Sequence, residues 1–161
     1  MYERNLTMHC AQKLTDHIYW IGSNDWSTER FENLFPIPNG VSYNSYFIDD
    51  EKTCIVDSVD DSIRQEFFDN VEHLLNGREL DYLIVNHMEP DHCATLVELL
   101  DRYPNVKMVG NKTTFRFFEQ FYGRPAPDNY YEVKEGDTID LGHHKLHSYT
   151  MPMVHWPEVT C

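Results

Sequence analysis

A short apolar run followed at once by ligand-type side chains constrains this chain more than any other feature. The run is Tyr82-Leu83-Ile84-Val85, and Asn86-His87-Met88-Glu89-Pro90-Asp91-His92 comes directly after it. A short apolar run of this kind predicts a buried strand. Open α/β sheets usually carry their chemistry where a core strand ends and a loop begins. The sequence therefore predicts a polar site at the end of a core strand.

Composition narrows the class of protein. The chain has 161 residues with 41% hydrophobic and 14% aromatic residues, which is typical of one globular domain. A net charge of −14 disfavours nucleic acid and anionic membranes as partners, because both are polyanions. No apolar stretch is long enough for a transmembrane helix, the first residues lack the order of a signal peptide, and no C-x-x-C pair occurs. We expect a reduced, cytoplasmic protein that binds cations.

The remaining patterns predict an α/β layered fold that is rich in strands at both ends. An early strand is followed by a long loop over 23–42, in which Trp26, Phe31 and Phe35 argue against disorder. The periodicity then predicts a hairpin of 46–48 and 53–56, helices over 58–76, 94–103 and 112–121, and strands over 82–85, 107–109, 131–133, 138–141 and 145–149.

The histidines and carboxylates after the central strand predict a metal site. His87, Glu89 and Asp91 occupy alternate positions, and His92 is adjacent to the last of them. Alternate residues leaving a strand can point the same way, while an adjacent pair can straddle two centres. This spacing favours two metals over one. A mixed nitrogen and oxygen ligand set suits iron, manganese or zinc.

His155 is the next candidate ligand. It follows a predicted strand and lies between Pro152 and Pro157, which fix the local backbone. Spacing alone leaves two interpretations open, a metal ligand or a buried histidine that only donates hydrogen bonds. His143, His144 and His147 are expected to be solvated or edge residues, and no role is assigned to the isolated histidines at 9, 17 and 73.

At these residues the chain resembles a known family. The pattern His87-x-Glu89-x-Asp91-His92, followed later by His155, resembles the iron-binding signature of the flavodiiron proteins, which belong to the metallo-β-lactamase superfamily. The hydrolases of that superfamily carry a histidine where Glu89 stands, and a hard anionic oxygen there favours iron. Further likeness lies in 18–22, 30–32, 38–46, 121–123 and 155–158.

The resemblance implies a fold and a set of ligands. The fold would be the N-terminal part of a metallo-β-lactamase-like αββα sandwich, with 1–161 forming part of a single diiron domain. One iron would be held by His87, Glu89 and His155, and the other by Asp91 and His92. No catalytic residue beyond the metal ligands is implied.

The resemblance also implies an activity and partners. The parent protein would be an oxidoreductase that reduces dioxygen to water, nitric oxide to nitrous oxide, or both. Electrons would come from FMN in a flavodoxin-like domain, which this chain lacks, or from a donor such as rubredoxin. A homo-oligomer is expected, often a head-to-tail dimer. Trp26, Phe31 and Phe35 would then form an apolar pocket wall for a small diatomic, although packing beneath the loop accounts for them equally well.

The chain departs from the family at its C-terminal end. The family's bridging aspartate and last histidine lie well downstream of the position of His155, and Glu158-Val159-Thr160-Cys161 lacks residues that the family usually has there. We therefore expect a fragment, or a domain completed by another chain, and weak iron binding or incomplete folding in isolation.

Two alternatives from other classes stay open. The first is a diiron protein that binds or senses oxygen without reducing it, since the same ligands serve both purposes. The second is a dinuclear zinc metallohydrolase in which Asp91 orients a metal-bound hydroxide. Glu89 in place of histidine counts against the hydrolase. Metal analysis distinguishes the zinc hydrolase from the iron-binding interpretations.

Overall fold

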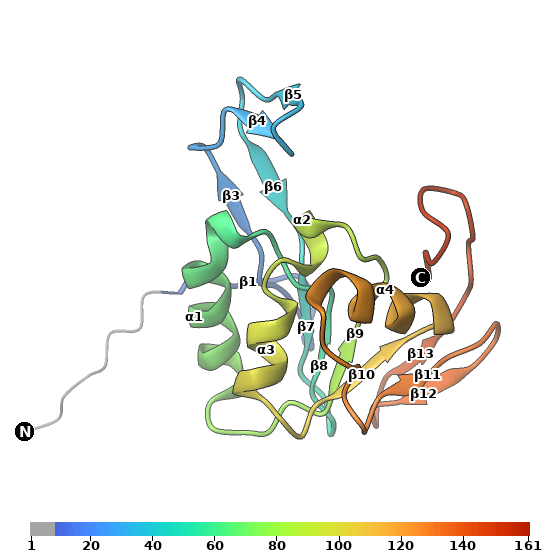
Figure 1. Cartoon of the computed structure of the whole chain (residues 1–161). Coiled ribbons are helices and arrows are strands. Elements are labelled where there is room, and N and C mark those ends of the chain that lie inside the picture. Colours follow the sequence, from blue (N-terminus) through green and yellow to red (C-terminus); the bar gives the residue numbers. More distant parts are fainter. Residues whose placement is uncertain (1–8) are drawn as a thin grey trace, which may run out of the picture.

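A seven-stranded mixed sheet forms the centre of the molecule. The structure, a computed structural model, describes residues 9–161 (Figure 1). The strand order is β1-β2-β7-β8-β9-β10-β11. Pairing is antiparallel from β1 to β8 and parallel from β8 to β11. The strands are β1 Gln12–Lys13, β2 Ile18–Trp20, β7 Tyr46–Ile48, β8 Cys54–Val56, β9 Tyr82–Ile84, β10 Lys107–Gly110 and β11 Tyr131–Glu132.

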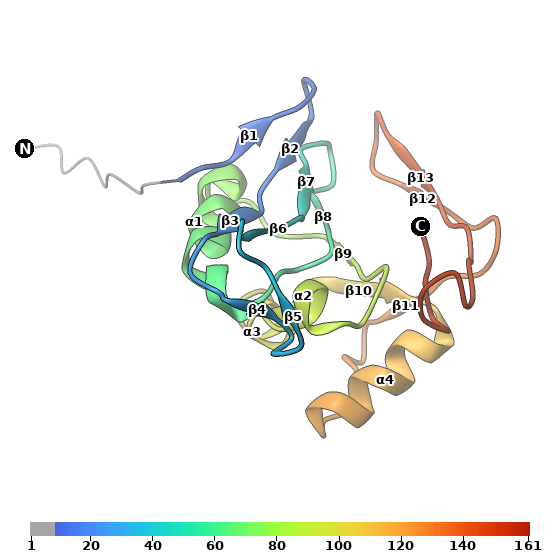
Figure 2. The same cartoon turned by 90° about the horizontal axis from the view of Figure 1, so that it is seen from above.

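Helices cover one face of this sheet, and a hairpin lies on the other side (Figure 2). The helices are η1 Asp61–Ile63, α1 Arg64–Leu75, α2 Pro90–Cys93, α3 Leu96–Arg102 and α4 Lys112–Tyr122. The hairpin pairs β12 Thr138–Asp140 with β13 Lys145–His147. The larger core lies under the helices and includes Phe47, Phe67, Leu83 and Phe118, all fully buried. A smaller core beneath the hairpin includes Val109 and Ile139.

Local sequence signals account for the helix ends. Asp60 caps η1 by accepting from the Ser62 amide, and Asn76 ends α1 in the left-handed conformation. Asn111 caps α4 by accepting from the amides of Thr113 and Thr114, and Gly123 closes that helix at a φ of 62°. The predicted hairpin, the three longer helices and the strands of the sheet are therefore confirmed, with shifts of a few residues at their ends.

The prediction of one long loop over 23–42 is wrong. This segment forms two small antiparallel ribbons that project beyond the body of the fold (Figure 1). Asp25 is buried and accepts hydrogen bonds from Ser27 and Thr28, which turns the chain between the ribbons. Strands this short carry too few residues for alternation to be detected. The pairs are β3 Ser23–Asp25 with β6 Val41–Tyr43, and β4 Arg30–Phe31 with β5 Phe35–Pro36.

Two of the histidines expected to be merely solvated or at an edge bind a buried carboxylate. Asp50 follows β7, and its Oδ1 lies 3.0 Å from His143 Nδ1 while its Oδ2 lies 2.7 Å from His144 Nδ1. The backbone amides of both histidines also donate to Asp50. His143 nonetheless keeps an exposed side chain. These contacts tie the β12–β13 turn to the main sheet. Among residues 9–161, no helix has the length and apolar character needed to cross a membrane.

Candidate metal centre

The candidate site lies at the carboxyl ends of parallel strands β8 and β9. Residues 86–93 leave β9 there, and Asp57 stands directly after β8. The segment 150–161 returns to the same edge, where the Thr160 amide donates to the Asn86 carbonyl across 3.0 Å. The position agrees with the rule that open α/β sheets place their sites beyond the strand ends.

Three of the predicted ligands converge on one point. His87 Nε2 lies 2.8 Å and His155 Nε2 lies 2.7 Å from the same oxygen of Glu89, Oε2. One donor atom from each of these side chains falls within 4.8 Å of the others. His87 is almost fully buried, whereas the His155 side chain is 59% exposed. The structure thus brings together residues 66 positions apart in sequence.

Asp91 and His92 lie beside this cluster rather than in it. His92 Nε2 is 3.5 Å from Asp91 Oδ2, and the rings of His87 and His92 are 5.8 Å apart. Alternation stops at Glu89, because Pro90 begins the short helix α2, which the sequence patterns did not predict. The helical turn therefore carries Asp91 and His92 into a second, adjacent group.

The donor set fits a metal. A carboxylate oxygen that faces two imidazole nitrogens is a mixed set suited to iron or zinc. Among residues 9–161, Asp91 Oδ1 and His92 Nδ1 are buried atoms without a hydrogen-bond partner. Buried polar atoms are normally satisfied, and unsatisfied ones often mark a functional site or an ion.

The pKa values of Glu89 and Asp91 are shifted in opposite directions by their surroundings. Burial by itself would raise the pKa of Glu89, but the hydrogen bonds from His87 and His155 outweigh it, so the pKa is lowered. Burial raises the pKa of Asp91, and the neighbouring charge of Glu89 adds to this rise. Glu89 is therefore the carboxylate held ionised, as a metal ligand must be.

Two further carboxylates contact the histidines of the site, and sequence patterns did not predict either. Glu158 Oε1 lies 2.9 Å from His87 Nδ1. Asp57 Oδ2 lies 3.7 Å from His92 Nδ1, and burial raises the Asp57 pKa to about 6. Asp57 has a φ of 57°, a left-handed conformation that aspartate tolerates better than most residues. A short carboxylate just past a strand end was the only signal for Asp57.

A third acidic residue, Glu32, approaches the site from the β4–β5 ribbon. Glu32 is exposed, and its pKa is raised first by desolvation and then by the negative charges of Glu89 and Asp91. The carboxyl group of the ribbon therefore interacts electrostatically with the metal loop. Sequence patterns gave no signal for this contact, because it joins two distant turns.

The aromatic residues predicted to line a pocket lie on the same ribbons. Trp26 and Phe35 are largely exposed, at 77% and 63%. Phe31 is half-buried, pairs with Phe35 across β4 and β5, and packs against the main core. Of the three aromatic residues, Phe31 packs against the core, whereas the side chains of Trp26 and Phe35 are too exposed for that role.

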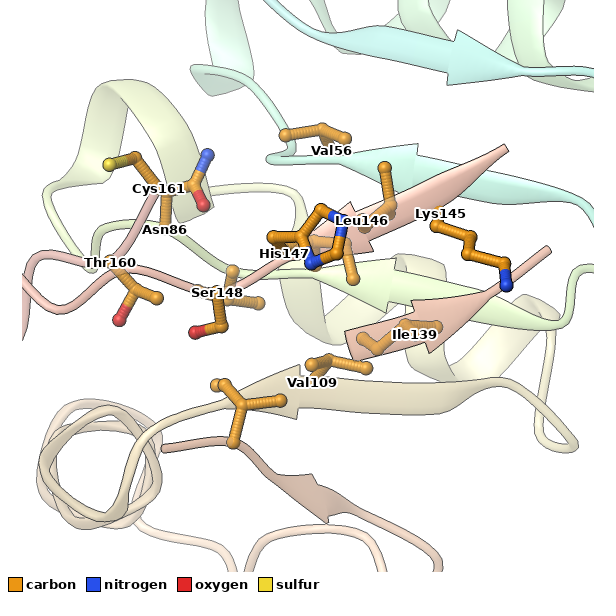
Figure 3. Close-up of a pocket in the computed structure, with 14 residues that line it drawn as sticks. Val56, Asn86, Val109, Ile139, Lys145, Leu146, His147, Ser148, Thr160 and Cys161 are labelled. Carbon is orange, nitrogen blue, oxygen red and sulfur yellow. The ribbon is translucent and has the colours of Figure 1, made fainter. Parts of the chain in front are cut away.

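An apolar cleft of about 320 Å³ lies away from the ligands, between the sheet and the β12–β13 hairpin. In Figure 3, Val56 and Val109 line it from the main sheet, and Ile139 and Leu146 from the hairpin. Asn86 lies at its edge, but none of the predicted metal ligands lines it. The cleft and the candidate metal centre are therefore separate features.

Comparison with known proteins decides the family. The family model described as ODP family beta lactamase matches residues 41–161. The chain belongs to the ODP family. This assignment confirms the resemblance to the metallo-β-lactamase-like domain of flavodiiron proteins, which was based on the pattern from His87 to His155.

Named relatives of this ODP-family chain include a diflavin flavoprotein and a flavorubredoxin. It is 36% identical over 157 residues to the putative diflavin flavoprotein A 3 of Nostoc sp., covering 97% of this chain and 27% of that protein. It is 32% identical over 155 residues to the anaerobic nitric oxide reductase flavorubredoxin of Vibrio vulnificus, covering 95% and 30%. The chain therefore spans less than a third of the length of these relatives.

Two solved structures share the fold of this chain. The flavodiiron protein of Giardia intestinalis superposes with a TM-score of 0.86 at 28% identity, covering 94% of this chain and 36% of the other. Rubredoxin oxygen:oxidoreductase of Desulfovibrio gigas gives a TM-score of 0.86 at 27% identity, covering 94% and 37%. The predicted α/β, metallo-β-lactamase-like fold is confirmed for this part of the domain.

Proposed function

We propose that this chain supplies ligands of a diiron centre in an oxidoreductase that reduces dioxygen to water, nitric oxide to nitrous oxide, or both. The observation that carries the proposal is the convergence of His87, Glu89 and His155 on one point. Relatives that are named for nitric oxide reduction and for oxygen reduction support the substrate class. Glu89 favours iron over zinc, because it places a hard oxygen donor where the hydrolases have histidine.

In this proposal the predicted ligands are divided between two iron ions. His87, Glu89 and His155 hold one iron, and Asp91 with His92 contributes to the second. Bound iron would supply reducing electrons and open coordination positions for a diatomic gas. The chain's own contribution is to fix ligand number and orientation at the strand ends. Electrons would arrive from FMN on a flavodoxin-like domain or subunit, or from a donor such as rubredoxin, in a cytoplasmic homo-oligomer.

Anaerobic reconstitution of the intact parent protein with ferrous iron tests the proposal. The expected result is bound iron, quantified by mass spectrometry, and consumption of dioxygen or nitric oxide at gas electrodes with reduced FMN as donor. Glu89→Ala should abolish both iron retention and gas consumption. Glu119→Ala, at an exposed position on α4, is the matched control and should change neither. Retention of zinc with hydrolytic turnover would overturn the proposal, and reversible oxygen binding without consumption would favour an oxygen-binding protein.

A further inference from the structure

Glu158 is a fully buried carboxylate that faces the candidate metal centre from outside the predicted ligand set. Its Oε1 accepts hydrogen bonds from His87 Nδ1 at 2.9 Å and from the Met88 amide at 3.0 Å. Glu158 is close to His155 in sequence, yet its side chain reaches the loop after β9. A buried carboxylate is costly unless hydrogen bonds compensate it, so its position calls for an explanation.

The backbone of Glu158 is held by the fold itself. Asn111 Nδ2 donates to the Glu158 carbonyl across 2.6 Å, and the Thr160 hydroxyl donates to the same oxygen across 3.2 Å. Asn111 in turn caps α4, and Thr160 is joined to Asn86 at the end of the central strand. The carboxylate is therefore placed by the fixed ends of a helix and a strand.

The contact determines which nitrogen of His87 carries the proton. An ionised carboxylate only accepts hydrogen bonds, so Nδ1 of His87 must be the donor toward Glu158. Nε2 is then the ring nitrogen that faces Glu89 and His155, where the donor atoms converge, and its lone pair becomes available to a metal once the hydrogen bond to Glu89 is given up. Trp156 packs edge-on against the His87 ring with centroids 4.9 Å apart, which restricts rotation of the ring.

Simple packing does not explain this arrangement. Among residues 9–161, Glu158 Oε2 is a buried oxygen without a hydrogen-bond partner. A leucine or methionine of similar size would fill the same space without the cost of an unsatisfied oxygen. Volume therefore does not account for the acidic group, whereas its hydrogen bonds to His87 and to the Met88 amide do.

We infer that Glu158 is the positioning residue of the metal centre, fixing the tautomer and orientation of His87 so that Nε2 faces the metal. This inference rests on the proposed function, because it assumes that His87 is a ligand. Metal-bound histidines commonly donate their second ring nitrogen to a carboxylate, and loss of that partner weakens metal affinity about 10- to 100-fold. The same loss is expected here.

The test combines metal titration with a tautomer measurement on the purified protein. Cobalt(II) affinity, followed by visible absorption, should fall about 10- to 100-fold in Glu158→Leu and less in Glu158→Gln, which keeps an acceptor oxygen. Nitrogen-15 NMR of the metal-free protein should show a proton on Nδ1 of His87, and loss of that proton in Glu158→Leu, where Glu89 is the only carboxylate that still accepts from the ring. Asp25→Asn is the matched control, since it alters another buried carboxylate, which accepts hydrogen bonds from Ser27 and Thr28 in its own turn.

The outcomes separate this inference from the proposed function. Unchanged cobalt affinity and an unchanged His87 tautomer in Glu158→Leu would overturn the inference while leaving the diiron proposal intact. Should Glu158→Leu fail to fold, Glu158→Gln decides by the same two measurements. Loss of affinity in Asp25→Asn equal to that in Glu158→Leu would also overturn the inference, because it would show a general effect of instability. Failure of the unmodified protein to bind iron while it binds cobalt would overturn the proposed function alone.

Discussion

The side chain of Asn111 donates to the backbone carbonyl of Glu158 across 2.6 Å, while its own oxygen caps α4. One amide thus joins the start of a helix to the segment that follows His155. Because Glu158 contacts His87, Asn111 connects helix capping with the geometry of the candidate metal centre.

Substitutions at Asn111 should separate these two roles. Asn111→Ala should lose about 1 kcal/mol from the cap and about 0.5 to 1.5 kcal/mol from the lost hydrogen bond to the Glu158 carbonyl, which still accepts from the Thr160 hydroxyl. Asn111→Asp keeps a capping oxygen but removes the donor, so much of the stability should remain while metal affinity falls. Urea denaturation and cobalt titration measure the two effects. Equal metal affinity in Asn111→Asp and the unmodified protein would show that the Glu158 backbone does not need this donor.

Asp57 combines a left-handed backbone with a hydrogen bond that holds the metal loop. Its Oδ1 accepts from the Asn86 amide across 2.7 Å. Asp57→Ala should destabilise the fold by about 1 to 3 kcal/mol, because a buried amide loses its acceptor. Asp57→Gly loses the same acceptor but adopts a φ of 57° without strain. The unfolding free energies should therefore differ by about 1 kcal/mol in favour of glycine, and a lower stability of the glycine variant would contradict this explanation.

The contact between Asp50 and His143 predicts a pH dependence of stability. The hydrogen bond and charge of Asp50 raise the pKa of His143 above its ordinary value of 6.5. A raised pKa means that the stabilising contribution is fully present below 6.5 and is lost as the pH rises through the folded-state pKa. His143→Gln should therefore lower the Tm more at about pH 5 than at about pH 9.

Calorimetry at both pH values measures this effect, and Asp50→Asn provides the control background. In that background the pH dependence of the His143→Gln effect should disappear. The lowered pKa of Asp50 acts in the opposite direction, since its contribution is present above the ordinary value of 3.8 and is lost as the pH falls through its folded-state pKa. A larger effect of His143→Gln at high pH would contradict the assignment.

Metal binding should raise thermal stability through the ligands that converge on Glu89. A metal that binds only the folded state adds about 2.7 kcal/mol of stability at a concentration a hundredfold above Kd. Differential scanning fluorimetry should therefore show an increased Tm on addition of ferrous iron or cobalt under anaerobic conditions, reversed by a chelator. Glu89→Ala should abolish the increase, whereas exposed Glu119→Ala should retain it. The same increase in both variants would indicate a site elsewhere.

Much of this molecule follows from local sequence. The buried run at β9 and the apolar periodicity of α1 and α4 predict their elements, because each pattern is repeated over several residues. His87 and Glu89 could be predicted from residue type and spacing, whereas the assignment of His155 as a ligand needed the family resemblance. Glu158 and Asp57 could not, because their roles depend on contacts with histidines across the fold. The Asp50 interaction with His143 likewise joins distant turns.

The long sequence separation between Glu89 and His155 means that a metal bound there would also affect the stability of the chain. Their side chains meet across 66 residues of sequence, so an ion held between them would cross-link the chain much as a disulfide does. In the chain-entropy description, closing a loop of this length restricts the unfolded chain by about 4 kcal/mol. Loss of iron would then remove this cross-link and leave segment 150–161 held only by its hydrogen bonds to the rest of the fold, such as that from Thr160 to Asn86. The proteolytic susceptibility of that segment should therefore increase when the metal is lost.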